Sequence, residues 1–278
     1  MESLDTIRKI VQDSEALLIT AGAGMGVDSG LPDFRGNEGF WRAYPPLAKL
    51  GISFEQMANP EWFEKDPALA WAFYGHRLHL YRATTPHEGF QILLDLAENK
   101  KNNYFVFTSN VDGQFQKAGF DEERIYEIHG SIHYLQCLYN CTDDIWPNEE
   151  NVEVDMKKFR ALRYPHCRHC GQVARPNILM FGDWGWNPKR AAKQEQRYNE
   201  WLEANRDKKM AIVEIGAGTA IPTVRMEGER IAAQFPKATL IRINPRDYQI
   251  DETLGFSLPM GGLEGIKAIA SSPTDYSR

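Results

Sequence analysis

Four cysteines form two close pairs that could hold a metal ion. Cys137 and Cys141 are separated by three residues, and Cys167 and Cys170 by two. Two such pairs can supply the four sulfur ligands of a tetrahedral zinc ion. Two disulfides could use the same residues, but the N-terminal sequence lacks the profile of an export signal, and thiols stay reduced in the cytoplasm. His166 and His169, which lie beside the second pair, could replace a cysteine as a ligand. Four thiolates are the simpler prediction, giving one structural zinc ion per chain.

Two glycine-rich segments each follow a predicted strand. Glycines let the backbone approach a pyrophosphate closely, and a helix that begins nearby stabilises its negative charge. With Asn244 at the end of a further strand, the two segments predict a dinucleotide that lies across the carboxyl edge of a sheet. The residues of these segments that we expect to bind the cofactor are Gly22, Ala23, Gly24, Gly26, Gly216, Ala217, Gly218 and Thr219.

This arrangement differs from that of a hydride-transferring dehydrogenase. Such an enzyme has a second strand that ends in an acidic residue about 20 residues after the glycine loop. Here the corresponding stretch, 40–46, has the sequence Phe-Trp-Arg-Ala-Tyr-Pro-Pro, which cannot form that strand. The dehydrogenase class is therefore disfavoured.

Polar side chains follow two other predicted strands. Asn110 and Asp112 come just after a strand at 104–108, and His129 follows a strand at 125–128. Chemistry in an open α/β sheet is expected at such strand ends, and a histidine there can act as a general base near neutral pH. Either Asn110 or Asp112 alone could simply make a turn and cap a helix. Their combination with His129 beside a glycine loop favours an active site.

Hydrophobic runs and helical periodicity alternate along the chain. Strands that alternate with helices predict an α/β fold, here a doubly wound, Rossmann-like parallel sheet. The expected strands cover 15–20, 104–108, 125–128, 177–181, 210–215 and 239–243, and the expected helices cover 67–82, 87–98, 188–204 and 224–234.

Two insertions interrupt this alternation. Residues 37–83 are rich in aromatic side chains and contain no convincing strand, whereas 131–174 contain the cysteine pairs. We expect one domain over 1–278 with two lobes, between which ligands usually bind. Residues 1–36, 84–130 and 175–278 would form the Rossmann-like lobe. The helical insertion 37–83 and a zinc-ribbon-like module at 131–174 would form the smaller lobe.

The composition narrows the class of protein. Of 278 residues, 42% are hydrophobic and 25% charged, which is typical of globular proteins. The net charge of −6 disfavours sequence-independent binding to nucleic acid, which requires a basic surplus. The longest apolar stretches fall far short of the roughly 20 residues of a membrane span. We therefore expect a soluble cytoplasmic protein that binds neither nucleic acid nor a membrane.

Taken in order, these motifs resemble those of the sirtuin family over nearly the whole chain. The segments 22–24 and 30–35 resemble the family's GAG and GIPDFR, and 108–112 with 117–119 resembles TQNID followed by AG. His129-Gly130 matches the catalytic HG, the cysteine pairs match the zinc module, and 175–183 resembles RPxxxxFGE. Gly216 begins the segment where the family has GTS, and Asn244 ends its late IN motif.

The resemblance implies an enzyme that consumes NAD to remove acyl groups from protein lysines. In that reaction the acyl oxygen attacks the nicotinamide ribose as nicotinamide leaves, and O-acyl-ADP-ribose forms. His129 would be the general base for a ribose hydroxyl, and Asn110 and Asp112 would orient the ribose and the leaving amide. Further cofactor contacts implied by the resemblance are Ser109, Asp33, Arg35 and Phe34, the last of which would shield the reactive face.

The family resemblance also suggests an acyl preference. Tyr74 and Arg77 match the Tyr-x-x-Arg pair of desuccinylase-type sirtuins. A guanidinium beside a phenol suits a terminal carboxylate such as that of a succinyl group, because it donates charge-assisted hydrogen bonds. The alternative is that Tyr74 packs in the core and Arg77 is solvated one turn later. The peptide that carries the acyl group would bind at Met180, Phe181 and Gly182.

Several positions depart from the family pattern. Ser109 replaces a glutamine, and Ala217 and Gly218 replace a Thr-Ser pair. The segment 109–119 also resembles the macrodomain-linked sirtuins, which transfer ADP-ribose to protein but lack the histidine that His129 matches. Deacylation is the first prediction. The alternatives are a protein mono-ADP-ribosyltransferase and a non-catalytic module that senses NAD.

Overall fold

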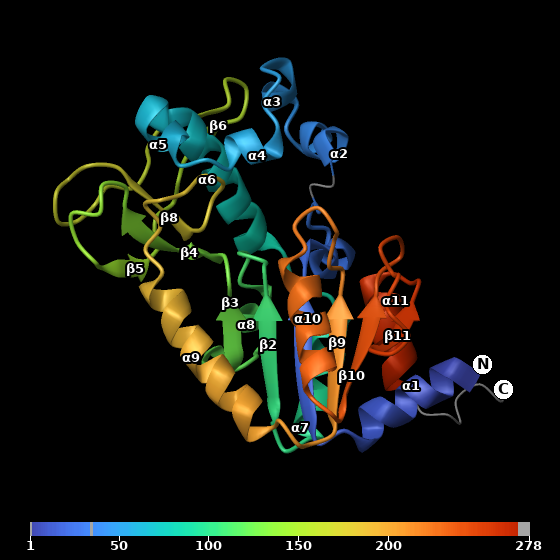
Figure 1. Ribbon diagram of the computed structural model, residues 1–278. Helices are drawn as coiled ribbons and strands as arrows, with labels where there is room; N and C mark the ends of the chain where they lie inside the picture. The colour runs from blue at the N-terminus through green and yellow to red at the C-terminus, as the bar shows by residue number, and fades with distance from the viewer. Residues whose placement is uncertain (1, 34–35, 272–278) are drawn as a thin grey trace.

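Six parallel strands form the central sheet of the protein (Figure 1). The computed structural model describes residues 2–33 and 36–271. The strand order is β11-β10-β9-β1-β2-β3, and all neighbouring pairs are parallel. The strands are β1 (Ala16–Ala21), β2 (Tyr104–Thr108), β3 (Ile125–Glu127), β9 (Met210–Ile215), β10 (Ala238–Ile243) and β11 (Gly255–Leu258).

Helices cover both faces of this sheet because the side chains of its buried strands point alternately to the two sides. On β1, Leu17 and Ile19 belong to the core on one face, and Leu18 belongs to the core on the other. The first face packs against α1 (Glu2–Asp13), α7 (Glu88–Glu98) and α11 (Gly262–Ala270). The second packs against α9 (Lys189–Ala204) and α10 (Thr223–Gln234). The predicted doubly wound α/β fold is confirmed.

A second group of elements lies beyond the carboxyl ends of the sheet strands (Figure 1). Its three-stranded antiparallel sheet has the order β5-β4-β8, and a two-stranded ribbon, β6-β7, accompanies it. A hydrophobic cluster around the fully buried Trp71 joins these strands to the helices, and the Trp71 indole donates a hydrogen bond to the Ala174 carbonyl at 2.9 Å. The elements are α2 (Gly36–Ala43), α3 (Pro45–Lys49), α4 (Phe54–Met57), α5 (Glu61–Lys65), α6 (Pro67–Ala83), β4 (Gly130–Cys137), β5 (Ile145–Pro147), β6 (Val154–Asp155), β7 (Arg160–Ala161) and β8 (Ala174–Ile178).

One strand prediction was wrong in both position and partner. The apolar run at 177–181 suggested a strand of the parallel sheet, but the strand is β8, which ends at Ile178 and pairs antiparallel with β4. The run continues past Ile178, but Leu179 and Phe181 are partly exposed and lie in a loop. A further strand, β11, was not predicted from the sequence; it pairs with β10 at the edge of the parallel sheet.

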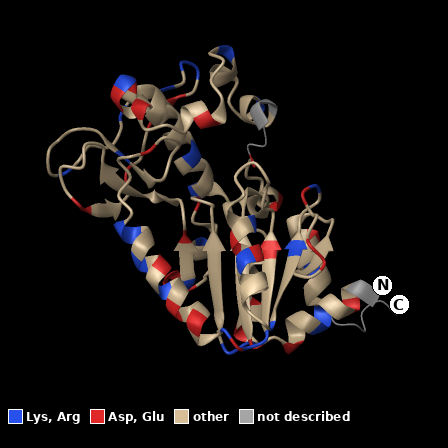
Figure 2. Ribbon diagram, in the orientation of Figure 1, with Lys and Arg blue, Asp and Glu red and all other residues tan. Residues whose placement is uncertain are grey.

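Charged side chains of both signs are interspersed over the surface, as Figure 2 shows along α9. A few are buried in pairs. Arg242 on β10 donates to Glu214 on β9 at 2.6 Å and to Glu229 on α10 at 2.8 Å, so it joins the sheet to a covering helix. Such burial is tolerated because the charges are paired and hydrogen-bonded. Among the described residues, no helix combines the length and apolar character needed to cross a membrane.

Candidate active site

The two glycine-rich loops lie in direct backbone contact at the carboxyl edge of the sheet. The Gly22 amide donates to the Ile215 carbonyl and the Gly24 amide to the Gly216 carbonyl, each at 3.0 Å. A Cβ atom on Gly24 would lie 2.6 Å from the Cα of Gly216, which itself has a φ of +62°. These glycines are therefore required by the packing of one loop on the other.

Asn244 holds the second loop in place. Its fully buried side chain donates to the Ala217 carbonyl at 2.8 Å and accepts from the amides of Arg246 and Asp247 at 3.0 Å. Space is open further along this loop, where a Cβ atom on Gly218 would reach its nearest neighbour only at 4.0 Å. Ala23 and Thr219 are exposed, and Gly26 is buried against Leu31. The second loop thus leaves open space beside Gly218 at the sheet edge, which suits the approach of a phosphate group.

Asn110 is fixed against the first loop. The Thr108 hydroxyl donates to the Ala21 carbonyl at 2.9 Å and accepts from the Asn110 amide at 3.0 Å. The Asn110 side chain then donates to the Gly22 carbonyl, also at 3.0 Å. The segment after β2 and the loop after β1 therefore form one hydrogen-bonded unit.

His129 adjoins this unit after the end of β3. Its carbonyl accepts from the Leu179 amide at 2.9 Å, which ties it to the segment after β8. The side chain is half-buried, and burial lowers its pKa below 6.5, while a hydrogen bond with the Ser109 backbone opposes that effect. Because the imidazole is neutral at pH 7, it can accept a proton, as a general base must.

Asp112 is buried in the turn between β2 and α8 (Gln114–Lys117). Its carboxylate accepts from the Gln114 amide at 2.9 Å. Burial raises the pKa of Asp112 to about 6, although this hydrogen bond and the charge of Arg77 oppose the shift. A carboxyl group with such a pKa can change its protonation state close to neutral pH.

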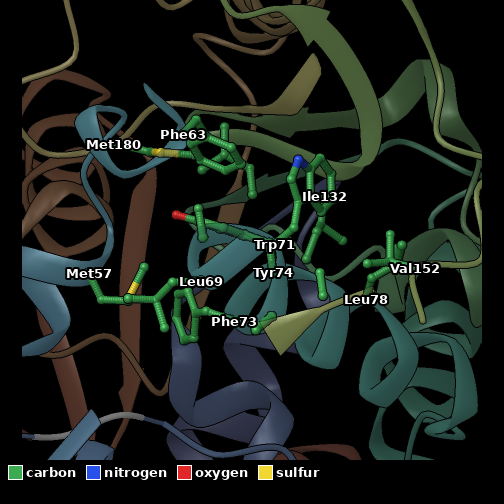
Figure 3. Close-up of a cluster of buried hydrophobic side chains, with 14 of the residues drawn as sticks. Met57, Phe63, Leu69, Trp71, Phe73, Tyr74, Leu78, Ile132, Val152 and Met180 are labelled. Atoms are coloured by element: carbon green, nitrogen blue, oxygen red, sulfur yellow. The ribbon is translucent and has the colours of Figure 1, made fainter. Parts of the chain in front are cut away.

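Tyr74 and Arg77 lie on α6 and are both buried. Tyr74 belongs to the hydrophobic cluster that Figure 3 shows, and its ring stacks on Phe63 at 5.5 Å. Burial raises its pKa to about 12, so the phenol is protonated at pH 7. Arg77 is only 7% exposed and lies over the rings of Phe73, Tyr74 and Tyr81. Tyr74 does pack in the core, but Arg77 is not solvated.

The three residues expected to bind peptide have different environments. Met180 is buried beside Phe63 in the same cluster (Figure 3). Phe181 is 37% exposed, its amide donates to the Ala58 carbonyl at 2.9 Å, and Gly182 is exposed with a φ of +65°. The loop is held by a fully buried ion pair between Arg175 and Asp183.

Of the other predicted cofactor contacts, Asp33 is half-exposed, whereas Phe34 and Arg35 lie outside the described residues.

The four cysteines converge on one point, with their sulfur atoms all within 4.8 Å of one another. The Sγ atoms of Cys137 and Cys170 lie 3.7 Å apart, and those of Cys141 and Cys167 lie 3.6 Å apart. Four sulfurs at 2.3 Å from a tetrahedral zinc ion would be separated by about 3.8 Å. The cysteines are free thiols. Their arrangement fits a structural zinc ion held by four thiolates and does not fit two disulfides.

Tyr81 and Gln114, which were not predicted from the sequence, connect Arg77 to the turn that carries Asp112. The Tyr81 hydroxyl accepts two hydrogen bonds from Arg77, and the Gln114 side chain donates to the Tyr81 carbonyl at 3.1 Å. The spacing of four between Arg77 and Tyr81 is a signal in the sequence, since residues four apart on a helix face each other. The contact of Gln114 with Tyr81 spans 33 residues and has no such local signal.

We predict that replacing Asp112 with asparagine stabilises the protein at pH 7. An unfolded aspartate has a pKa near 3.8, whereas the folded value is about 6, so between these values only the folded state binds the proton. Stability therefore falls as the pH rises from 4 to 6, and the variant avoids this loss, which amounts to about 2–3 kcal/mol at pH 7. Urea unfolding from pH 4 to 7 measures the difference.

The control is Asp251→Asn, because two hydrogen bonds from Thr253 lower the pKa of that surface carboxyl group. This variant should lose stability at pH 7 instead of gaining it. A stability difference between wild type and Asp112→Asn that is the same at pH 4 and pH 7 would show that Asp112 does not titrate in this range.

The cysteine site predicts about one zinc ion per chain in elemental analysis of the purified protein. Cys170→Ser should lose the metal and much of the stability, since structural zinc contributes directly to folding. His169→Ala should retain the metal, because the His169 imidazole bonds to Asp144 at 3.0 Å, and the contact of this residue with Cys167 Sγ comes from the backbone amide, which alanine keeps. Absence of metal together with two disulfides in the intact mass would contradict this assignment.

Comparisons with known proteins agree with this architecture. Residues 22–218, more than half of the chain, match the Sir2 family model. The chain is 28% identical to an NAD-dependent protein deacylase of Aeropyrum pernix over 264 residues, covering 95% of each chain. It is 27% identical to another from Thermus thermophilus over 285 residues, covering 100% of this chain and 98% of the relative. A solved Sir2 homologue in complex with NAD has the same fold, with a TM-score of 0.72 and 24% identity over 96% of this chain and 92% of its own. The chain therefore belongs to the Sir2 family.

Proposed function

We propose that this protein uses NAD to remove acyl groups from lysine side chains of proteins, with nicotinamide and O-acyl-ADP-ribose as products. The observation that carries the proposal is the position of a half-buried, neutral His129 against the Ser109 backbone, next to Asn110, whose side chain is bonded to the first glycine loop. The relatives from Aeropyrum and Thermus, which align over nearly their whole length, are named as NAD-dependent protein deacylases. The family assignment and the site chemistry thus support the same reaction.

Each residue of the site has a distinct role in this proposal. When bound, NAD supplies the ribose carbon that the acyl oxygen attacks as nicotinamide leaves. The imidazole of His129 accepts a proton from a ribose hydroxyl. Asn110 is held against Gly22 and orients the ribose, while Asp112 holds the leaving amide from its buried turn. The half-buried Gly218 and the exposed Thr219 approach the phosphates.

We further propose a preference for acidic acyl groups such as succinyl. Arg77 brings a buried positive charge close enough to Asp112 to oppose the rise of that carboxyl group's pKa. An acyl chain that reaches the nicotinamide end of the site can therefore place a terminal carboxylate against the guanidinium. A charge-assisted pair formed away from water is strong, so it favours succinyl over the uncharged acetyl group.

The peptide that carries the acylated lysine is proposed to bind along the segment after β8. The Leu179 amide is bonded to the His129 carbonyl, so this segment begins directly beside the general base. Phe181 and Gly182 are exposed and can contact the peptide, whereas the side chain of Met180 packs in the core and supports the segment from beneath. The Arg175–Asp183 ion pair keeps the loop in this position.

Arg77→Met tests the acyl preference. Loss of the guanidinium should lower kcat/KM for a succinyl-lysine peptide by about tenfold to hundredfold, because the transition state loses a hydrogen bond between charged groups. The kcat/KM for an acetyl-lysine peptide should be nearly unchanged. The measurement is initial rates on both peptides with saturating NAD.

The matched control is Arg82→Met, which removes the same charge from an exposed position on α6, where the guanidinium bonds to backbone carbonyls of Asn148 and Glu150. It should not alter the ratio of the two rates. If Arg77→Met lowers both activities equally, Arg77 supports the fold and does not select the acyl group.

A further inference from the structure

Tyr81 lies one helical turn after Arg77 on α6, on the same face of the helix. Its hydroxyl oxygen accepts from Arg77 Nε at 3.0 Å and from Nη2 at 2.7 Å. Both side chains are buried. Because one oxygen accepts from two nitrogens of the same rigid fork, the plane of the guanidinium is fixed relative to the helix.

The aromatic rings around Arg77 restrict its position but not its direction. The guanidinium carbon lies 5.2 Å from the ring centre of Phe73 and 5.7 Å from that of Tyr74. Cation–π attraction is broad, so it does not select which N–H group points where. The two hydrogen bonds to Tyr81 supply that selection. They engage the edge formed by Nε and Nη2, so the edge formed by Nη1 and Nη2 is directed away from Tyr81.

Tyr81 is itself anchored to the turn that carries Asp112. Its carbonyl accepts from the Gln114 side chain at 3.1 Å, and the Gln114 amide donates to the Asp112 carboxylate at 2.9 Å. Lys117 on α8, which follows this turn, donates to the carbonyls of Arg82 and Thr84 at 2.7 and 2.5 Å. The end of α6 and the Asp112 turn are therefore tied together, which fixes the position of Arg77 relative to the active site.

We propose that Tyr81 is a positioning residue that determines acyl specificity by orienting Arg77. The proposal rests on the preference for acidic acyl groups described above. With the Nε–Nη2 edge held by Tyr81, the fork formed by Nη1 and Nη2 meets the acyl carboxylate with two parallel hydrogen bonds. Without the hydroxyl, the guanidinium loses the two hydrogen bonds that hold its Nε–Nη2 edge, and its alignment with the carboxylate weakens. An acetyl group has no carboxylate, so its removal does not depend on this orientation.

Tyr81→Phe removes only the hydroxyl. We expect the KM for a succinyl-lysine peptide to rise about tenfold, the scale of a hydrogen bond to a charged group, with little change in kcat. Removal of acetyl from the same peptide should be unchanged. Tyr198→Phe is the matched control, since it deletes another buried hydroxyl bonded to a charged side chain, Glu227, in a different hydrophobic core from that of α6. This control should change neither KM nor kcat for either peptide.

A double-mutant cycle separates positioning from a structural role. In an Arg77→Met background, Tyr81→Phe should have no further effect on succinyl removal, because the group that it positions is gone. Equal loss of both activities in Tyr81→Phe, or an undiminished effect in the Arg77→Met background, would overturn the proposal. If the wild-type protein does not prefer succinyl, or if Arg77→Met keeps that preference, the proposed acyl specificity fails first and this inference fails with it.

Discussion

The backbone contact between the two glycine loops is the constraint on which the site depends. β1 and β9 are neighbours, with Ala21 opposite Ile215, so the loops leave the sheet side by side. They can do so only because Gly24 and Gly216 have no side chains, as a Cβ on either would overlap the other loop. Asn110 is bonded to the first loop and Asn244 to the second. The placement of the catalytic groups therefore follows from a contact that involves no catalytic residue.

Helix α6 connects the zinc-binding part of the chain to this site. Near its start, Trp71 packs in the core that it shares with two of the four cysteines, Cys137 and Cys167. At its end, Gln114 and Lys117 tie it to the turn that carries Asp112. Arg77 lies between these two attachments. A zinc ion held by the four cysteines would stabilise this core and, through it, the helix that carries Arg77.

Much of the sheet, and the metal site, could be predicted from the sequence because their signals are local. Apolar runs identify β1, β2, β9 and β10, and the spacing of the cysteines identifies the metal site. The antiparallel sheet could not be predicted, because β4 and β8 pair across a long insertion and β8 contains Arg175 and Pro176, which disfavour a strand assignment. The burial of Arg77 was also not predictable, because it depends on how α6 packs in the tertiary structure, which spacing along one helix does not show. Sequence spacing could show that Tyr81 faces Arg77, but not that the pair is buried.

The central claim is that the groups around His129 transfer an acyl group from lysine to NAD. Mass spectrometry of a succinyl-lysine peptide incubated with NAD and the purified protein tests it most directly. The deacylated peptide, nicotinamide and O-succinyl-ADP-ribose should appear in equal amounts, and His129→Ala should bind NAD but form none of them. An intact acylated peptide, together with ADP-ribose attached to an added protein by both wild type and His129→Ala, would contradict it.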